Sequence, residues 1–96
     1  MASARKLPRP FEMHWGSGEI VEEASYAGEY HEPTIQLMEY MAGEAQGSFS
    51  IRFCTYNHQG RLQRSPLMLS EADVDGLRQA LKTTPRLRAI LQDLVS

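Results

Sequence analysis

Three arginines that could bind phosphate lie close together around a turn in the middle of the chain. The stretch SIRFCTYNHQGRLQRS contains Arg52, Arg61 and Arg64, with Tyr56 and His58 between them. Cationic side chains follow the phosphates of a nucleic-acid strand, and aromatic rings stack on its bases, each stack contributing about 1–3 kcal/mol. These five residues are therefore the candidate binding surface of the sequence.

Charge is unevenly distributed along the chain. The net charge is −2, but residues 1–48 carry three Lys/Arg and eight Asp/Glu, a net of −5. Residues 49–96 carry seven Lys/Arg and four Asp/Glu, a net of +3, and no acidic residue occurs between Glu44 and Glu71. The near-neutral pI therefore hides a basic region. Its arginines could equally be solvated or meet an acidic protein partner, and the sequence leaves these alternatives open.

The spacing of the other reactive residues gives little support to metal binding or catalysis. The three histidines and the single cysteine match none of the recurring metal-ligand pairs. No histidine is placed to act as a base for Cys54, and the glycine-containing segments at 16–18 and 43–47 are typical of turns rather than of phosphate loops. We therefore expect no metal site, no cofactor and no enzymatic activity.

The strand that carries Arg52 and Tyr56 has the clearest alternation in the chain. In SFSIRFCTY, Phe49, Ile51, Phe53 and Thr55 point one way, and Ser50, Arg52, Cys54 and Tyr56 point the other. NHQG predicts a hairpin loop, because Asn opens turns through its side-chain acceptor and Gly60 can supply a positive φ. RLQRSPLML is the predicted next strand, and Pro66 indicates a sheet edge or a bulge within it.

The segments before residue 48 predict three further strands. FEMHW at 11–15 alternates, GSG at 16–18 predicts a turn, and EIVEEASY at 19–26 is a plausible partner strand. The glutamates from Glu19 to Glu29 are most simply a solvated face. TIQLMEYMA at 34–42 is apolar on both faces, which favours a central strand.

After Ser70 the apolar period changes from two to that of a helix. Ser70 is predicted to cap a helix near 71–82, with Asp73 completing a capping box. Thr84 and Pro85 predict the start of a second helix near 85–95. The expected fold class is α+β: a twisted four- to five-stranded antiparallel sheet followed by one kinked or two short C-terminal helices, which pack on one face of the sheet.

The length and composition predict one soluble domain. We expect a flexible basic tail at 1–10 and a single α+β domain at 11–96. No uncharged run approaches the ~20 residues that span a bilayer, so we expect no contact with a membrane. A single cysteine permits no disulfide within the chain, and this favours the reducing cytoplasm.

Part of the sequence resembles a known family. The strand FSIRFCTY, the turn ending in glycine and the segment PLMLSEADVDGL resemble the core of the positive-cofactor-four transcriptional coactivators, over about residues 34–82. The resemblance implies a curved four-stranded antiparallel sheet followed by a helix, dimerisation through the helix region and single-stranded DNA channels on the sheet. It places Arg52, Tyr56, Arg61 and Arg64 along such a channel.

The expected function is non-catalytic binding of single-stranded DNA or RNA, in a coactivator-like or regulatory role. The residues expected to bind are Arg52, Tyr56, His58, Arg61 and Arg64. Surplus apolar residues in the 34–42 strand and in LRAILQDLV also predict a homodimer. The alternative is a homodimeric protein-interaction module of unknown pathway that does not bind nucleic acid.

Overall fold

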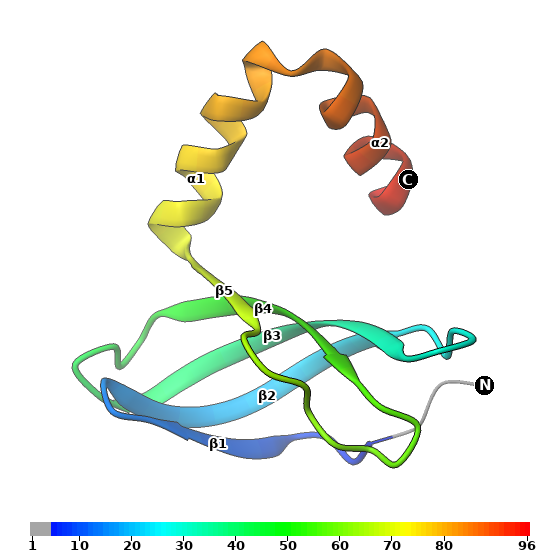
Figure 1. Ribbon diagram of the computed structural model, residues 1–96. Coiled ribbons are helices and arrows are strands. Elements are labelled where there is room, and N and C mark those ends of the chain that lie inside the picture. Colours follow the sequence, from blue (N-terminus) through cyan, green and yellow to red (C-terminus); the bar gives the residue numbers. More distant parts are fainter. Residues whose placement is uncertain (1–4) are drawn as a thin grey trace.

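The chain forms a five-stranded antiparallel sheet followed by two helices, which confirms the α+β class. The computed structural model describes residues 5–96 (Figure 1). The elements are β1 (Arg9–Met13), β2 (Gly16–Ser25), β3 (Glu32–Gly43), β4 (Phe49–Tyr56), β5 (Leu67–Ser70), α1 (Glu71–Ala80), a 3-10 turn (Leu81–Thr83) and α2 (Pro85–Val95). The strand order β1-β2-β3-β4-β5 follows the chain, so β3 is central, as its two apolar faces predict.

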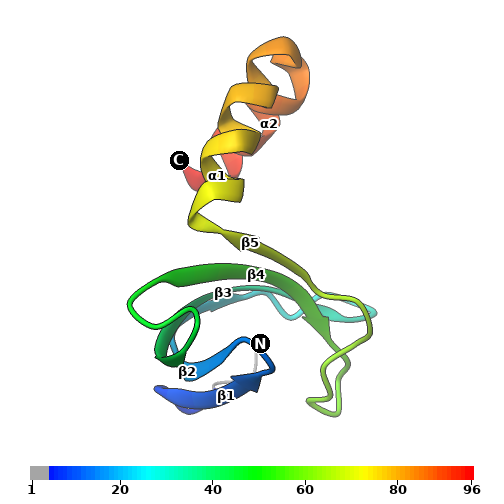
Figure 2. The same ribbon diagram turned by 90° about the vertical axis from the view of Figure 1, so that its left-hand side faces the viewer.

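The sheet is strongly curled and therefore has two unlike faces. Figure 2 shows β1 and β2 curling beneath β3 and β4, while the helices stand on the opposite side. We call the enclosed side the concave face, and the side toward the helices the convex face. On β4 the concave face carries Ser50, Arg52, Cys54 and Tyr56, and the convex face carries Ile51 and Phe53.

The core of the sheet lies on the concave face. Its apolar part contains Ile20, Met38 and Tyr40, all buried. The Phe11 ring meets the Tyr40 ring edge to face, with centroids 5.2 Å apart, and the Trp15 Nε1 donates to the Tyr40 hydroxyl at 2.9 Å. The curl of β1 onto β3 therefore closes one end of the concave face with aromatic contacts.

The first hairpin turns earlier than the sequence predicts. The turn is at His14 and Trp15, and the expected turn GSG instead belongs to β2, with Gly16 paired to Met13. Gly18 is needed for close approach, because a Cβ there would lie 1.9 Å from the carbonyl oxygen of Glu39 on β3. Glycine is required at this position because β2 and β3 approach closely there, and not because the chain turns.

Strand β5 is shorter than the predicted 61–69 strand. Only Leu67–Ser70 pairs continuously with β4, and before it there is a single bridge between Tyr56 and Leu62. Ser65 has φ +58°, and Pro66 has no N–H to donate, so regular pairing cannot extend through them. As Pro66 predicts, β5 is an edge strand.

Both helices begin at the predicted residues. The Ser70 Oγ accepts from the Asp73 N–H at 3.2 Å and the Asp73 carboxylate accepts from the Ser70 N–H at 3.0 Å, which is the predicted capping box. Pro85 opens α2, but the Thr84 hydroxyl donates to the Leu81 carbonyl instead of capping that helix. Neither helix buries a residue, so the expected packing of the helices on the sheet is not made within one chain.

The basic segment before residue 11 lies partly within the sheet. Residues 1–4 of the expected tail fall outside the described residues, whereas Arg9 and Pro10 belong to β1 and Arg5 pairs with Glu23. Within residues 5–96, neither helix is long and apolar enough to cross a membrane.

Candidate nucleic-acid interface

A group of charged and polar side chains occupies the other end of the concave face. Its members come from the segment before β1 and from β1, β2, β3 and β4. We call it the arginine cluster, and it consists of Arg5, Arg9, Glu23, Glu32, Gln36, Arg52 and Tyr56. Alternation on the three central strands brings these residues onto one face, because residues two apart on a strand share a side.

Gln36 is the centre of the arginine cluster. It is 1% exposed, and its Nε2 donates to the Glu23 carboxylate at 2.6 Å and to the Tyr56 hydroxyl at 2.9 Å. Its Oε1 accepts from the Arg52 Nε at 2.6 Å. The amide therefore links three strands. Both its nitrogen and its oxygen are hydrogen-bonded, as the burial of an amide requires.

Glu23 is a buried carboxylate held between two arginines. Its oxygens lie 2.9 Å from the Arg9 Nη2 and 3.3 Å from the Arg5 Nε. Burial alone would raise the pKa of the Glu23 carboxyl, but the hydrogen bonds from Gln36 and Arg9 and the charges of Arg9 and Arg5 outweigh it and lower the pKa below its ordinary value. Glu23 is therefore charged at neutral pH, and its expected place on a solvated face is wrong.

Arg5 covers the aromatic ring of Tyr56. The guanidinium carbon lies 3.7 Å from the ring centroid, and the Arg5 Nη2 donates to the Glu32 carboxylate at 2.9 Å. Burial opposes the charge of Arg5, but the hydrogen bond to Glu32 and the neighbouring Glu23 raise its pKa above the ordinary value. The cation is thus fixed flat on the ring, the arrangement of a cation–π pair.

Two of the five predicted binding residues lie inside this cluster. Arg52 is 7% exposed and Tyr56 is 6% exposed, so neither is on the open sheet surface that the sequence predicts. The reason is the curl of the sheet, which encloses the face that alternation assigns to them (Figure 2). They do share a face, as predicted.

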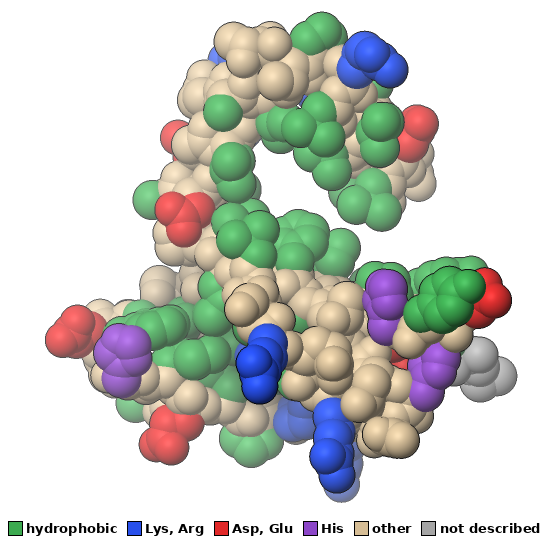
Figure 3. All heavy atoms as spheres, viewed as in Figure 1, with side chains coloured by type: hydrophobic (Ala, Val, Ile, Leu, Met, Phe, Trp, Pro, Cys, Tyr) green, Lys and Arg blue, Asp and Glu red, His purple; other side chains and the backbone are tan. Residues whose placement is uncertain are grey.

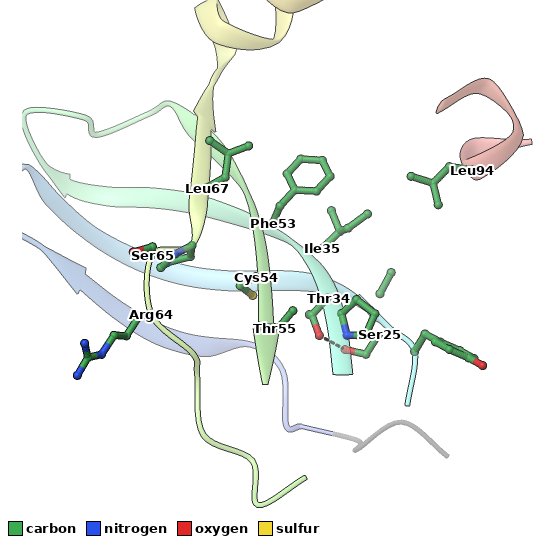
Figure 4. Close-up of a pocket in the computed structure, with 14 residues that line it drawn as sticks. Ser25, Thr34, Ile35, Phe53, Cys54, Thr55, Arg64, Ser65, Leu67 and Leu94 are labelled. Carbon is green, nitrogen blue, oxygen red and sulfur yellow. Dashed lines mark hydrogen bonds between the residues drawn. The ribbon is translucent and has the colours of Figure 1, made fainter. Parts of the chain in front are cut away.

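The other three predicted residues, His58, Arg61 and Arg64, lie in the loop 57–66 and are exposed. The predicted turn is confirmed: the Asn57 Oδ1 accepts from the Arg61 N–H at 2.9 Å, and Gly60 has φ +81°. Within residues 5–96 neither Arg61 nor Arg64 forms an ion pair, and Figure 4 shows the Arg64 side chain pointing away from Phe53 and Leu94. A ring nitrogen of His58 lies 3.1 Å from the Gly28 carbonyl oxygen.

Cys54 is buried on the concave face of β4, next to the arginine cluster. Its Sγ lies 3.6 Å from the Gln36 Oε1, and burial raises the pKa of the thiol. The neutral thiol is a poor nucleophile and a poor metal ligand. In the part of the chain that the structure describes, no three His, Cys, Asp or Glu side chains come together as a metal site would require.

Sequence reasoning misses most of the arginine cluster. It places Arg5 and Arg9 in a tail, and it gives Glu23, Glu32 and Gln36 no role in binding. One usable signal is the pair of polar residues Thr34 and Gln36 in the phase of Met38 on an otherwise apolar strand, opposite Arg52 in the antiparallel register. The N–H groups of a buried amide need acceptors, and Glu23 on the neighbouring strand supplies one of them.

Comparison with known proteins finds no matching family model, no matching curated protein and no matching solved structure.

Proposed function

We propose that the protein binds single-stranded nucleic acid, without catalysis, at the rim of the concave face where the loop 57–66 meets the arginine cluster. The observation that carries the proposal is the pair of exposed arginines, Arg61 and Arg64, which form no ion pair in the described chain and belong to the loop that follows Tyr56.

The exposed arginines of the loop would bind the phosphates. No acidic residue lies between Glu44 and Glu71, so the loop presents uncompensated positive charge. The hydrogen bonds of Asn57 to the backbone fix the turn on which Arg61 stands, and this lowers the entropy lost on binding. Binding of this kind depends on salt, because cations released from the nucleic acid drive it.

The ring of Tyr56 would stack on a base after Arg5 leaves it. Arg5 lies on the ring as a planar guanidinium, 3.7 Å from the centroid, and a nucleobase needs a similar flat surface. In this proposal Arg5 moves from the ring to a phosphate, which it can bind bidentately. Arg52 stays with Gln36 and supports the strand; it does not contact phosphate directly.

The homodimer is part of the same proposal. Apolar side chains exposed on the convex face and on both helices favour it, and the arginine cluster lies on the opposite side of the sheet. A dimer formed on the convex face therefore leaves the arginine cluster open, although Arg64 of the loop also lines the larger hollow on that face. A coactivator-like or regulatory role in transcription, suggested by the resemblance to the positive-cofactor-four family, would suit a dimer that holds two strands.

The test is a titration of a labelled single-stranded oligonucleotide at two salt concentrations. The wild type is compared with Arg61→Ala/Arg64→Ala, both exposed and therefore safe for folding. We expect weaker binding by the wild type at higher salt. The double variant should bind less tightly, and its salt slope should flatten by about 0.7 for each phosphate that it no longer binds.

The control is Lys82→Ala, which removes one exposed cation from the 3-10 turn between the helices. It should bind as the wild type does. Absence of binding at low salt, or no greater loss in Arg61→Ala/Arg64→Ala than in Lys82→Ala, would reject the proposal. A homodimer that fails to bind would then support the alternative, a protein-interaction module whose arginines meet an acidic partner.

A further inference from the structure

The exposed face of β4 is the apolar one. In one chain the concave face buries Ser50, Arg52 and Cys54, whereas Ile51 is only half-buried and Phe53 is 37% exposed. Burying an arginine while a phenylalanine faces water is unfavourable unless another surface covers the phenylalanine. The convex face therefore lacks a covering layer in the single chain.

The helices carry a second uncovered apolar surface opposite the first. Figure 3 shows hydrophobic side chains on the inner side of the helical arch and on the sheet below, with open space between them. Two adjoining hollows of about 770 and 490 Å³ occupy this space. We call them together the apolar groove. Its main apolar lining residues are Ile51, Phe53, Leu67, Leu77, Leu91 and Leu94.

The two walls of the apolar groove face each other without closing. Figure 4 shows Leu94 on α2 pointing across the open space toward Phe53 and Ile35 on the sheet. Leu94 remains 62% exposed, and Val95 beside it is 81% exposed. An apolar surface this continuous is uncommon on a protein that works as a monomer.

The overall dimensions exceed those of a compact monomer of this length. The accessible surface is 7157 Å², whereas a compact monomer of 10.9 kDa exposes about 5,600 Å². The excess of roughly 1,600 Å² is about twice what one partner buries in a standard interface. The radius of gyration is 14.5 Å, against about 12.5 Å for a compact chain of this length.

We infer that α2 of a second copy fills the apolar groove, so that two copies exchange their helical arms across a two-fold axis. The second copy is the occupant that covers both walls at once, because a two-fold axis places each α2 against the other sheet while its own sheet receives the partner's α2. The inference rests on the proposed homodimer, states how it is built and is independent of nucleic-acid binding.

The charges of α2 suit this pairing. Arg86 and Arg88 are in its first half and Asp93 is near its end. A two-fold axis across two neighbouring α2 helices aligns them antiparallel, which brings Asp93 of each copy toward the arginines of the other. Opposite charges at both ends favour this register and disfavour a parallel one.

The first test is the mass in solution by light scattering. We expect the wild type to have twice the chain mass of 10.9 kDa. Leu91→Glu/Leu94→Glu places charges in the groove and should give monomers. The control, Leu62→Glu, changes an exposed leucine outside the groove and should remain dimeric. A monomeric wild type, or a dimer that survives Leu91→Glu/Leu94→Glu, would overturn the inference.

The second test asks which copy provides the helix. Two separately tagged chains, both with Cys54→Ser, carry Ile35→Cys in one and Leu94→Cys in the other. They are unfolded together, refolded and treated with a short thiol cross-linker. If the arms are exchanged, the cross-linker should join two chains that carry different tags. A third chain, Cys54→Ser with both Ile35→Cys and Leu94→Cys, is cross-linked alone. Tags that are never joined, together with a third chain that is cross-linked only within itself, show the arm on its own sheet and reject the exchange.

Discussion

The guanidinium of Arg5 lies flat on the ring of Tyr56, with its carbon 3.7 Å from the ring centroid. The two residues are far apart in the chain, and this contact fastens the N-terminal segment across the concave face. Arg5 also reaches Glu32 and Ser25 through its Nη2, at 2.9 and 3.0 Å. Arg5 therefore covers one face of the ring and is held there by polar contacts with neighbouring strands.

Substitutions at Tyr56 should separate stacking from hydrogen bonding. Tyr56→Phe keeps the ring but loses the hydrogen bond from Gln36, so we expect a loss of about 1 kcal/mol in stability and little change in oligonucleotide affinity. Tyr56→Ala removes the ring, and affinity should fall by about 1–3 kcal/mol. Urea unfolding and the oligonucleotide titration measure the two effects. Equal affinity of the two variants would exclude stacking on this ring.

Glu23 should make the stability depend on pH in the acid range. Its pKa is lowered in the folded protein from an ordinary value of 4.5, so its contribution is present above that value and is lost as the pH falls through the lower folded pKa. Glu23→Gln should be less stable than the wild type at neutral pH. Urea unfolding measured down to about pH 3 should show that the difference in unfolding free energy between the two proteins becomes smaller as the pH falls. A constant gap between the two proteins would contradict this account.

Two glycines should respond to alanine in opposite directions. At Gly18 a Cβ would meet the carbonyl oxygen of Glu39, so Gly18→Ala should cost about 1–3 kcal/mol or more. At Gly76, inside α1, a Cβ meets nothing within 4 Å, so Gly76→Ala should stabilise the protein by about 0.4–1 kcal/mol. Thermal unfolding compares the pair. A tolerated Gly18→Ala would mean that β2 and β3 can separate at this point.

Cys54 should be protected from thiol reagents while the protein is folded. It is buried, and burial raises the pKa of its thiol, so both access and the thiolate fraction are reduced. We expect slow alkylation in native buffer and rapid alkylation in denaturant, followed by mass spectrometry. Rapid native labelling would show that the concave face opens readily.

The sequence predicts the positions of the strands and helices better than it predicts which face of the sheet is buried. Alternation assigns Arg52 and Phe53 to opposite sides of β4, and the change of period locates the capping box at Ser70. Alternation does not say which side a sheet encloses. That choice depends on the curl of the sheet and on side chains from elsewhere in the chain, Glu23 on β2 and Arg5 before β1, which no local pattern connects to β4.

The candidate site is predictable only in part for the same reason. The turn chemistry of Asn57 and Gly60 is local, so the loop with Arg61 can be predicted. The side chain that covers the Tyr56 ring is Arg5, which lies in a distant part of the chain. Composition alone makes Arg5 resemble a solvated tail, because its carboxylate partners become visible only when the strands are paired.

The order of the strands affects how the protein is made. Each strand of the sheet pairs with the one that precedes it in the chain, from β1 to β5. Successive hairpins of this kind close short loops, so folding can proceed strand by strand as the chain is synthesised. The helical arm, α1 to α2, follows β5, and neither helix buries a residue against its own sheet. If two copies exchange arms as proposed, each new chain completes its sheet before it meets a partner, and the protein concentration sets the rate of the final assembly step.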